Sequence, residues 1–268
     1  MFWRFVSFLR KDLYIELSYK FSFVFQFAGI FFQITLFYFM AKFVGQGADR
    51  FLVNYGGSYF AFVLIGIAYQ SYFNLALGSF SQNLRRDQML GTLEMMLMTP
   101  TSGQQVVVLS ASYDMLFTSF RIIIYIGVGA LFFGLDLQHI NILSCITILI
   151  LSILSFSGLG ILSAAIIMYV KRGDPVVWLF STLNTLFGGV YFTTDVLPPL
   201  LKKLSLLLPM THTLHAFRQA LLFGAGIEDI ITEIMILLVF SIITLPAGLL
   251  AFKLAIQQAK RHGSLGQY

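Results

Sequence analysis

The chain has 268 residues, of which 58% are hydrophobic and 11% are charged, and its formal net charge is +5. Soluble domains carry about 25% charged residues, so the polar surface of a soluble globular protein is missing here. The basic residues are scattered in short groups between apolar segments, which argues against nucleic acid as a partner. A single cysteine, Cys145, excludes a disulfide framework within the chain. The composition predicts an all-α integral membrane protein.

Residues 1–20 form the first predicted element, an amphipathic helix that lies in the headgroup plane of the membrane. Its apolar residues recur at steps of three and four positions, and its cationic residues complete the pattern: Phe2, Phe5, Leu9, Leu13 and Leu17, with Arg4, Arg10, Lys11 and Lys20. A secretory signal peptide is the alternative, but the basic region is too long and no small-residue cleavage site follows it.

Residues 21–268 are predicted to be one transmembrane domain with six spans, because about 20 apolar helical residues cross a hydrocarbon core of about 30 Å. The predicted spans are residues 21–43, 57–80, 104–134, 141–170, 176–192 and 230–252, of which the fifth is short. Small residues such as Gly158 and Gly160 predict close helix contacts in the fourth span. With the N-terminus inside, eleven basic residues fall on cytoplasmic segments and five on outer ones, so both termini are expected in the cytoplasm.

Residues 193–229 contain two short helical patterns separated by Pro209. Each has only about a dozen residues, too few to cross the membrane. We predict a re-entrant hairpin on the outer side that packs against other helices. Two helices lying flat on the outer surface remain the alternative.

The segment of residues 83–100 is polar between two apolar spans and is predicted to be a short cytoplasmic helix. Leu90, Leu93 and Leu97 mark one face, with Met89 and Met96 beside it. Gly91 permits a bend, Pro100 ends the helix, and Thr101 or Ser102 can cap the next span. An exposed Leu/Met face suits the docking of another protein. A helix lying on the lipid headgroups, with Arg85 and Arg86 on phosphates, is the alternative left open by the residues alone.

Candidate chemistry is sparse. The sequence has no G-x-x-x-x-G-K-[ST] motif with which to bind nucleotide phosphates. His212 and His215 have a spacing suitable for two metal ligands, but no third ligand is evident and we predict no metal site. Asp114 and Arg121 share a helix face within the third span, where charged residues either line a polar path or form structural bridges.

Two ordered motifs carry a resemblance to a known family. The run Arg85-Arg86, then Gly91-Thr92-Leu93-Glu94, then Thr99-Pro100 resembles a signature of ATP-binding-cassette (ABC) exporter permeases of the type-two class. Residues 188–222, GGVYFTTDVLPPLLKKLSLLLPMTHTLHAFRQALL, resemble a second stretch of that family.

The resemblance implies that two permease copies, identical or related, form the pathway and that each docks a cytoplasmic ABC ATPase, which would bind ATP and Mg²⁺ in place of this chain. It implies a multi-pass protein of a prokaryotic plasma or inner membrane that exports an amphipathic drug, lipid or lipid-linked glycan. The residues expected to couple to the ATPase are Arg85, Arg86, Gly91, Thr92, Leu93, Glu94, Met96, Leu97, Thr99 and Pro100. The loop at residues 171–175 would add contacts.

The alternatives are an ion- or proton-coupled carrier that uses Asp114 and Arg121, and a membrane-embedded enzyme. No internal symmetry supports the first, and no cluster of catalytic residues supports the second.

Overall fold

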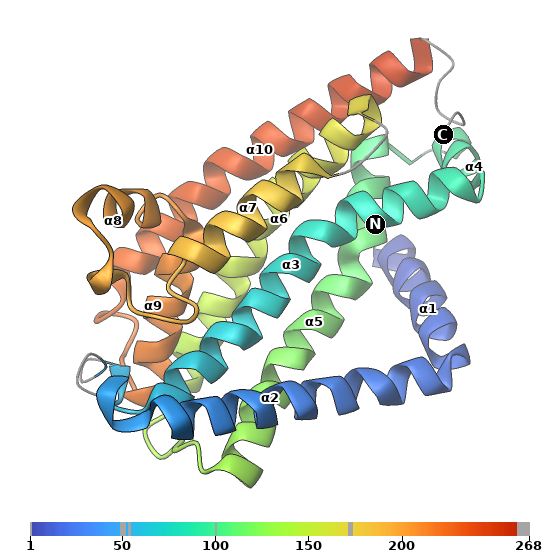
Figure 1. Cartoon of the computed structure of the whole chain (residues 1–268). Coiled ribbons are helices and arrows are strands. Elements are labelled where there is room, and N and C mark those ends of the chain that lie inside the picture. The colour runs from blue at the N-terminus through green and yellow to red at the C-terminus, as the bar shows by residue number, and fades with distance from the viewer. Residues whose placement is uncertain (1, 49–51, 53–54, 100, 171–173, 262–268) are drawn as a thin grey trace.

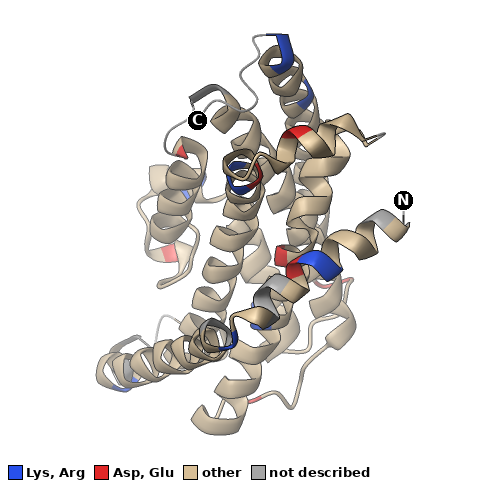
Figure 2. Cartoon of the chain, turned by 90° about the vertical axis from the view of Figure 1, so that its right-hand side faces the viewer, with Lys and Arg blue, Asp and Glu red and all other residues tan. Residues whose placement is uncertain are grey.

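The computed structural model describes residues 2–48, 52, 55–99, 101–170 and 174–261, and these residues form an all-helical bundle without strands. Five long helices make up most of it: α2 (Lys20–Ala48), α3 (Tyr59–Met89), α5 (Gly103–Phe133), α6 (Ile142–Val170) and α10 (Ile231–Arg261). Each is long and apolar enough to cross a membrane, which confirms five of the six predicted spans. Figure 2 shows that most of the length of these helices carries no charged residue.

Apart from α7 (Pro175–Phe187), which runs along the side of the bundle, the shorter helices lie at its two ends (Figure 1). Helix α1 (Phe2–Ser18) precedes α2, and α4 (Thr92–Met98) joins α3 to α5 at what we call the α4 end. Helix α7 runs toward the opposite end, called the α8 end, where η3 (Thr194–Val196), α8 (Pro199–Ser205) and α9 (Pro209–Leu222) follow. The two helices expected within residues 193–229 are therefore present as α8 and α9, on either side of Pro209 at the first position of α9.

The predicted fifth span, 176–192, is not one continuous crossing helix. Helix α7 has 13 residues, about 20 Å of rise, which is less than the thickness of the hydrocarbon core. It stops because Gly188 and Gly189 follow, the second with a φ of +76° that favours glycine. Hydrophobic and aromatic residues continue through Val190 and Tyr191, so the span predicted from the sequence extends beyond the observed end of the helix.

Arg218 of α9 stabilises the chain beyond this break. Its guanidinium is 2% exposed and donates hydrogen bonds of 2.9 Å to the carbonyl oxygens of Gly189 and Phe62. It also stacks on the ring of Phe62, 3.5 Å from the ring centroid. One side chain thus holds the end of α7, the start of α3 and α9 together.

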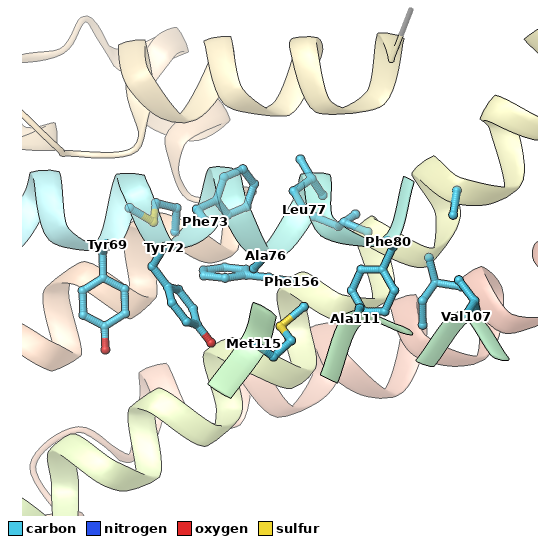
Figure 3. Packing of buried hydrophobic residues seen from close by; sticks show 14 of the residues in the cluster. Tyr69, Tyr72, Phe73, Ala76, Leu77, Phe80, Val107, Ala111, Met115 and Phe156 are labelled. Carbon is cyan, nitrogen blue, oxygen red and sulfur yellow. The ribbon is translucent and has the colours of Figure 1, made fainter. Parts of the chain in front are cut away.

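Helix α3 is the centre of the bundle, with 83% of its most apolar window buried, and it packs against α5, α6, α7 and α9. Figure 3 shows its aromatic face, on which Tyr72 and Phe73 meet Phe156 of α6 and Phe80 lies toward the α5 residues Val107 and Ala111. The rings of Phe73 and Phe156 are 4.8 Å apart and nearly perpendicular, an arrangement that aromatic pairs favour.

The most extensive helix contact is that of α6 with α10, and the two glycines predicted to permit close contacts of α6 lie against different helices, Gly158 against α10 and Gly160 against α3. A Cβ at Gly158 would lie 2.6 Å from the backbone carbon of Thr244 on α10, and one at Gly160 would collide with the Phe80 ring. Ser155 adds a hydrogen bond of 3.0 Å to the carbonyl oxygen of Leu237.

Replacing Gly158 with alanine should therefore destabilise the protein, by about 1–3 kcal/mol, because neither backbone can move without repacking the α6–α10 contact. Gly127→Ala on α5 is the matched control, since a Cβ there meets nothing within 4 Å; it should be neutral or stabilising by up to about 1 kcal/mol. Thermal unfolding of both purified variants in the same detergent measures the difference. Equal stability of the two variants would contradict this account of the contact.

Candidate functional site at the α4 end

The loop predicted to couple to another protein is bent rather than continuous. Helix α3 extends to Met89, so residues 83–89 belong to it, and the expected single helix over 83–100 is wrong in its bounds. Gly91 makes the bend with a φ of +68°, a conformation that residues with a Cβ adopt at a cost. The hydroxyl of Thr92 then bonds back to the carbonyl oxygen and a side-chain oxygen of Asp87, at 3.2 and 3.3 Å. Helix α4 is thereby fixed at an angle to α3.

The exposed side of α4 is not the side that the leucine spacing indicated. Leu93 is only 1% exposed and belongs to the main hydrophobic core, and Met96 and Leu97 pack against that core. The side chains that face outward belong to the flanking turn and the other face of α4: Met89, Leu90, Glu94, Met95 and Met98. Because both faces of this short segment are apolar, the sequence alone could not tell which of them meets the bundle.

The loop then leads directly into α5. Thr99 has a ψ of 163°, the extended conformation expected before a proline, and its hydroxyl donates to the Met96 carbonyl oxygen at 2.6 Å. Pro100 itself lies outside the described residues. Ser102 caps α5 in a reciprocal pair with Gln105, so of the two predicted caps it is Ser102 that is used. Loop residues 171–173 also lie outside the described part, whereas Asp174 caps α7 and accepts hydrogen bonds from Ser81 and Ser163.

Helix α1 is connected to the same end of α3. An Oδ1 atom of Asp12 lies 3.4 Å from both the Arg86 guanidinium and the Lys11 ammonium, and Asp12 is itself buried. Arg86 therefore holds α1 beside the α3–α4 bend, in addition to the topological role predicted for it. Its neighbour Arg85 is half-buried.

Asp114 and Arg121 line one cavity of about 260 Å³ between α2, α3 and α5. The Nδ2 of Asn83 donates to the Asp114 carboxylate at 2.6 Å and to the Ser110 carbonyl oxygen at 2.8 Å. The two charged residues predicted to share a helix face thus do face the same space. In the described part of the chain, no ion pair joins them.

A larger cavity, of about 480 Å³, lies at the α8 end and is lined by His212 and His215. The Nε2 of His212 is 2.9 Å from the Leu206 carbonyl oxygen, and the Nδ1 of His215 is 2.9 Å from a Glu233 oxygen. Within the described part of the chain, no three His, Cys, Asp or Glu side chains come together where they could bind a metal ion. At the rim, the Asp195 carboxylate raises the pKa of Lys202 by accepting its hydrogen bond of 2.7 Å.

Residues 20–222 match the family model described as the ABC-2 type transporter, about three quarters of the chain. The chain belongs to this family. It is therefore a multi-pass membrane protein and the transmembrane subunit of an ABC-type transporter, and the family implies an ATPase partner. No curated protein matches the sequence.

Three polar residues of this ABC-2 subunit escaped the sequence analysis: Asp12, Asn83 and Asp87. All three are buried in spite of their polarity, and each bonds a residue of another element or of the α3–α4 turn. Asn83 could have been found, because Ser79, Asn83 and Arg86 recur at steps of four and three on one face of α3.

The burial of Leu93 leads to a direct test. Leu93→Asp should cost about 3 kcal/mol or more, because it removes a core side chain and buries a charge. Met98→Asp introduces the same group on the exposed side and should leave stability within about 0.5 kcal/mol of the wild type. Thermal unfolding and the protease sensitivity of residues 90–102 report the difference. Should Met98→Asp prove the more damaging substitution, the orientation of α4 would be wrong.

Proposed function

We propose that this chain is the membrane subunit of an ATP-driven exporter, in which two copies form the pathway and each binds a separate cytoplasmic ATPase at the α4 end. The observation that supports this most is the family match together with the exposed apolar surface of the α4 end: Met89, Leu90, Met95 and Met98 around Glu94. Flexible methionines suit a contact with a moving partner. ATP and Mg²⁺ would bind to that partner, and this chain would supply no nucleotide site.

The contacts of α4 supply a route for coupling. Leu93 and Thr92 fix α4 to α3, and a Cβ at Gly103, at the start of α5, would collide with Ile256 of α10. Movement of α4 is therefore passed to three of the long helices. The buried Asp12 connects α1 to the same junction through Arg86. An ATPase that binds α4 with different contacts in two states would shift the bundle between two arrangements.

We further propose that residues 193–229 re-enter the membrane from the outer side and that α7, with the residues after Gly188, forms the fifth of six crossings. Helix α9 is almost entirely buried against the bundle, so this irregular backbone is covered by protein. Helix α8 and the turn after it expose Leu200, Leu204, Leu206 and Leu207, as expected of a segment in contact with lipid. Both termini and α4 would then lie in the cytoplasm of a prokaryotic cell.

The substrate that this arrangement supports is amphipathic: a drug, a lipid or a lipid-linked glycan. The shared cavity of Asp114 and Arg121 is the observation that favours a second candidate, an ion- or proton-coupled carrier. Transport into vesicles separates the two, since an exporter requires ATP with the partner ATPase and a carrier requires only the ion gradient.

Docking at α4 is tested with a double variant, Met95→Ser with Met98→Ser. It should weaken binding of the co-purifying P-loop ATPase by about tenfold or more, because two exposed apolar contacts are lost. The control is Leu200→Ser with Leu207→Ser, a pair of similar exposure at the α8 end, which should leave the ATPase bound. Glu94→Ala, also on this surface, should lower substrate-stimulated ATP hydrolysis. Wild-type binding by the first variant, together with unchanged hydrolysis by the last, would show that the ATPase does not dock on α4.

A further inference from the structure

The cavity between α2, α3 and α5 has a composition unlike the core around it. Its polar lining comes from three helices: Gln26 from α2, Ser79, Gln82, Asn83 and Arg86 from α3, and Tyr113, Asp114, Thr118 and Arg121 from α5. Asn83 and Thr118 are buried, Asp114 and Arg121 are half-buried, and Gln82 and Arg86 are exposed, so the inner part of this lining is built into the protein. Such a set is expensive at this position unless a ligand or an aqueous path completes its hydrogen bonds.

The carboxylate and the guanidinium in the cavity differ in how far their hydrogen-bonding capacity is used. Asp114 accepts the Asn83 amide at 2.6 Å. Arg121 lacks any ion pair or hydrogen bond to the residues that the structure describes, and its Nε is buried without an acceptor. A guanidinium has five N–H donors in a fork that matches a phosphate. Arg121 therefore provides free donors inside the cavity, and Arg86 lines the same space.

The cavity also lies at a suitable depth. Helix α3 has 31 residues and is about 46 Å long, which exceeds the hydrocarbon core by about 16 Å. Asn83 and Arg86 are six and three residues from its end at Met89, and hydrogen bonding places Asp114 level with Asn83. Arg121 is seven residues further along α5, about 10 Å deeper. The cavity thus runs from the headgroup level into the hydrocarbon, a path along which an arginine side chain extends toward the membrane surface.

Its walls suit a lipid more than a soluble anion. The rings of Tyr113 and Phe117 stack 5.8 Å apart along the α5 side of the cavity. Next to these lining positions, the α5 side chains of Leu116, Phe120 and Ile123 are exposed and apolar. The volume of about 260 Å³ is below the roughly 300–1,000 Å³ of sites that enclose a drug-sized molecule. The cavity therefore fits a headgroup whose acyl chains remain outside, against α5.

We propose that this cavity binds the phosphate-bearing headgroup of a membrane lipid from the leaflet at the α4 end. Arg121 and Arg86 donate to the phosphate oxygens, and Asp114 accepts a hydrogen bond from an ammonium or hydroxyl group of the headgroup. The bound lipid would connect α5 to α3, and through Arg86 and Asp12 to α1. This site is separate from the docking surface on α4 and requires no ATPase.

The test uses the full chain, purified and delipidated in detergent. Short-chain phosphatidylethanolamine or phosphatidylglycerol should raise the unfolding temperature and appear as bound species in native mass spectra. Diacylglycerol of the same chain length, which lacks the phosphate, should do neither. Equal stabilisation by diacylglycerol would overturn the proposal. Equal stabilisation by inorganic phosphate at the same concentration would overturn the lipid assignment.

Arg121→Gln should weaken phospholipid binding by about tenfold or more, since a charge-assisted bidentate contact is lost. Lys203→Gln removes the same charge from an exposed position at the α8 end and should bind as the wild type. Asp114→Asn should keep the affinity for phosphate-bearing lipids but reduce the preference for headgroups that carry a donor. If Arg121→Gln does not fold, Arg121→Lys keeps the charge without the fork and should bind at intermediate strength. Wild-type affinity in a folded Arg121 variant would show that the headgroup binds elsewhere.

Discussion

The arrangement of the α8 end depends on how the bundle satisfies a broken helix. Helix α7 ends after 13 residues, and the carbonyl oxygens beyond it need donors that an apolar surrounding cannot supply. Arg218 provides them, and Gly66 of α3 makes room, because a Cβ there would collide with the Val190 carbonyl oxygen. This one guanidinium fixes α9 against α3, and α9 in turn packs on α6 and α10. The short hairpin is thus anchored by polar bonds at its centre, while the leucines of α8 and the turn after it, such as Leu200 and Leu207, remain exposed.

The α4 end is organised by different means. There the helices are joined by carboxylates: the buried Asp12 between α1 and α3, the buried Asp87 at the bend, and the half-buried Asp174 between α3, α6 and α7. Each accepts from short side chains or from a cation, so each contact is directional and tolerates little sliding. Apolar contacts dominate the middle of the bundle, where Tyr72, Phe73 and Phe156 interlock. A displacement of α4 would consequently be transmitted through these directional contacts to the close-packed middle of the bundle.

Long apolar runs could be predicted from the sequence because a membrane imposes a length, and five helices follow those runs within a few residues, apart from extensions of α2, α3 and α10 at their polar ends. The end of α7 was missed because the run of hydrophobic and aromatic residues continues past it through Val190 and Tyr191, so the composition does not change where the helix stops. The outward face of α4 was missed because both faces carry apolar side chains, and only packing against the bundle buries Leu93 and leaves Met95 exposed. The hydrogen bond between Asn83 and Asp114 joins residues 31 positions apart in the chain. It depends on how α3 and α5 are aligned, which a local sequence pattern does not reveal.

Helix α2 has the smallest buried share of the five long helices: 17% of its most apolar window is buried, against 22% for α5 and α10 and 83% for α3. Phe25, Phe32, Phe39 and Phe43 all point away from the protein. The free energy that stabilises α2 as a membrane span therefore comes largely from the transfer of its side chains into hydrocarbon rather than from contacts with α3 and α5. The thickness and composition of the bilayer therefore set the tilt and position of α2 more directly than they do for the largely buried α3.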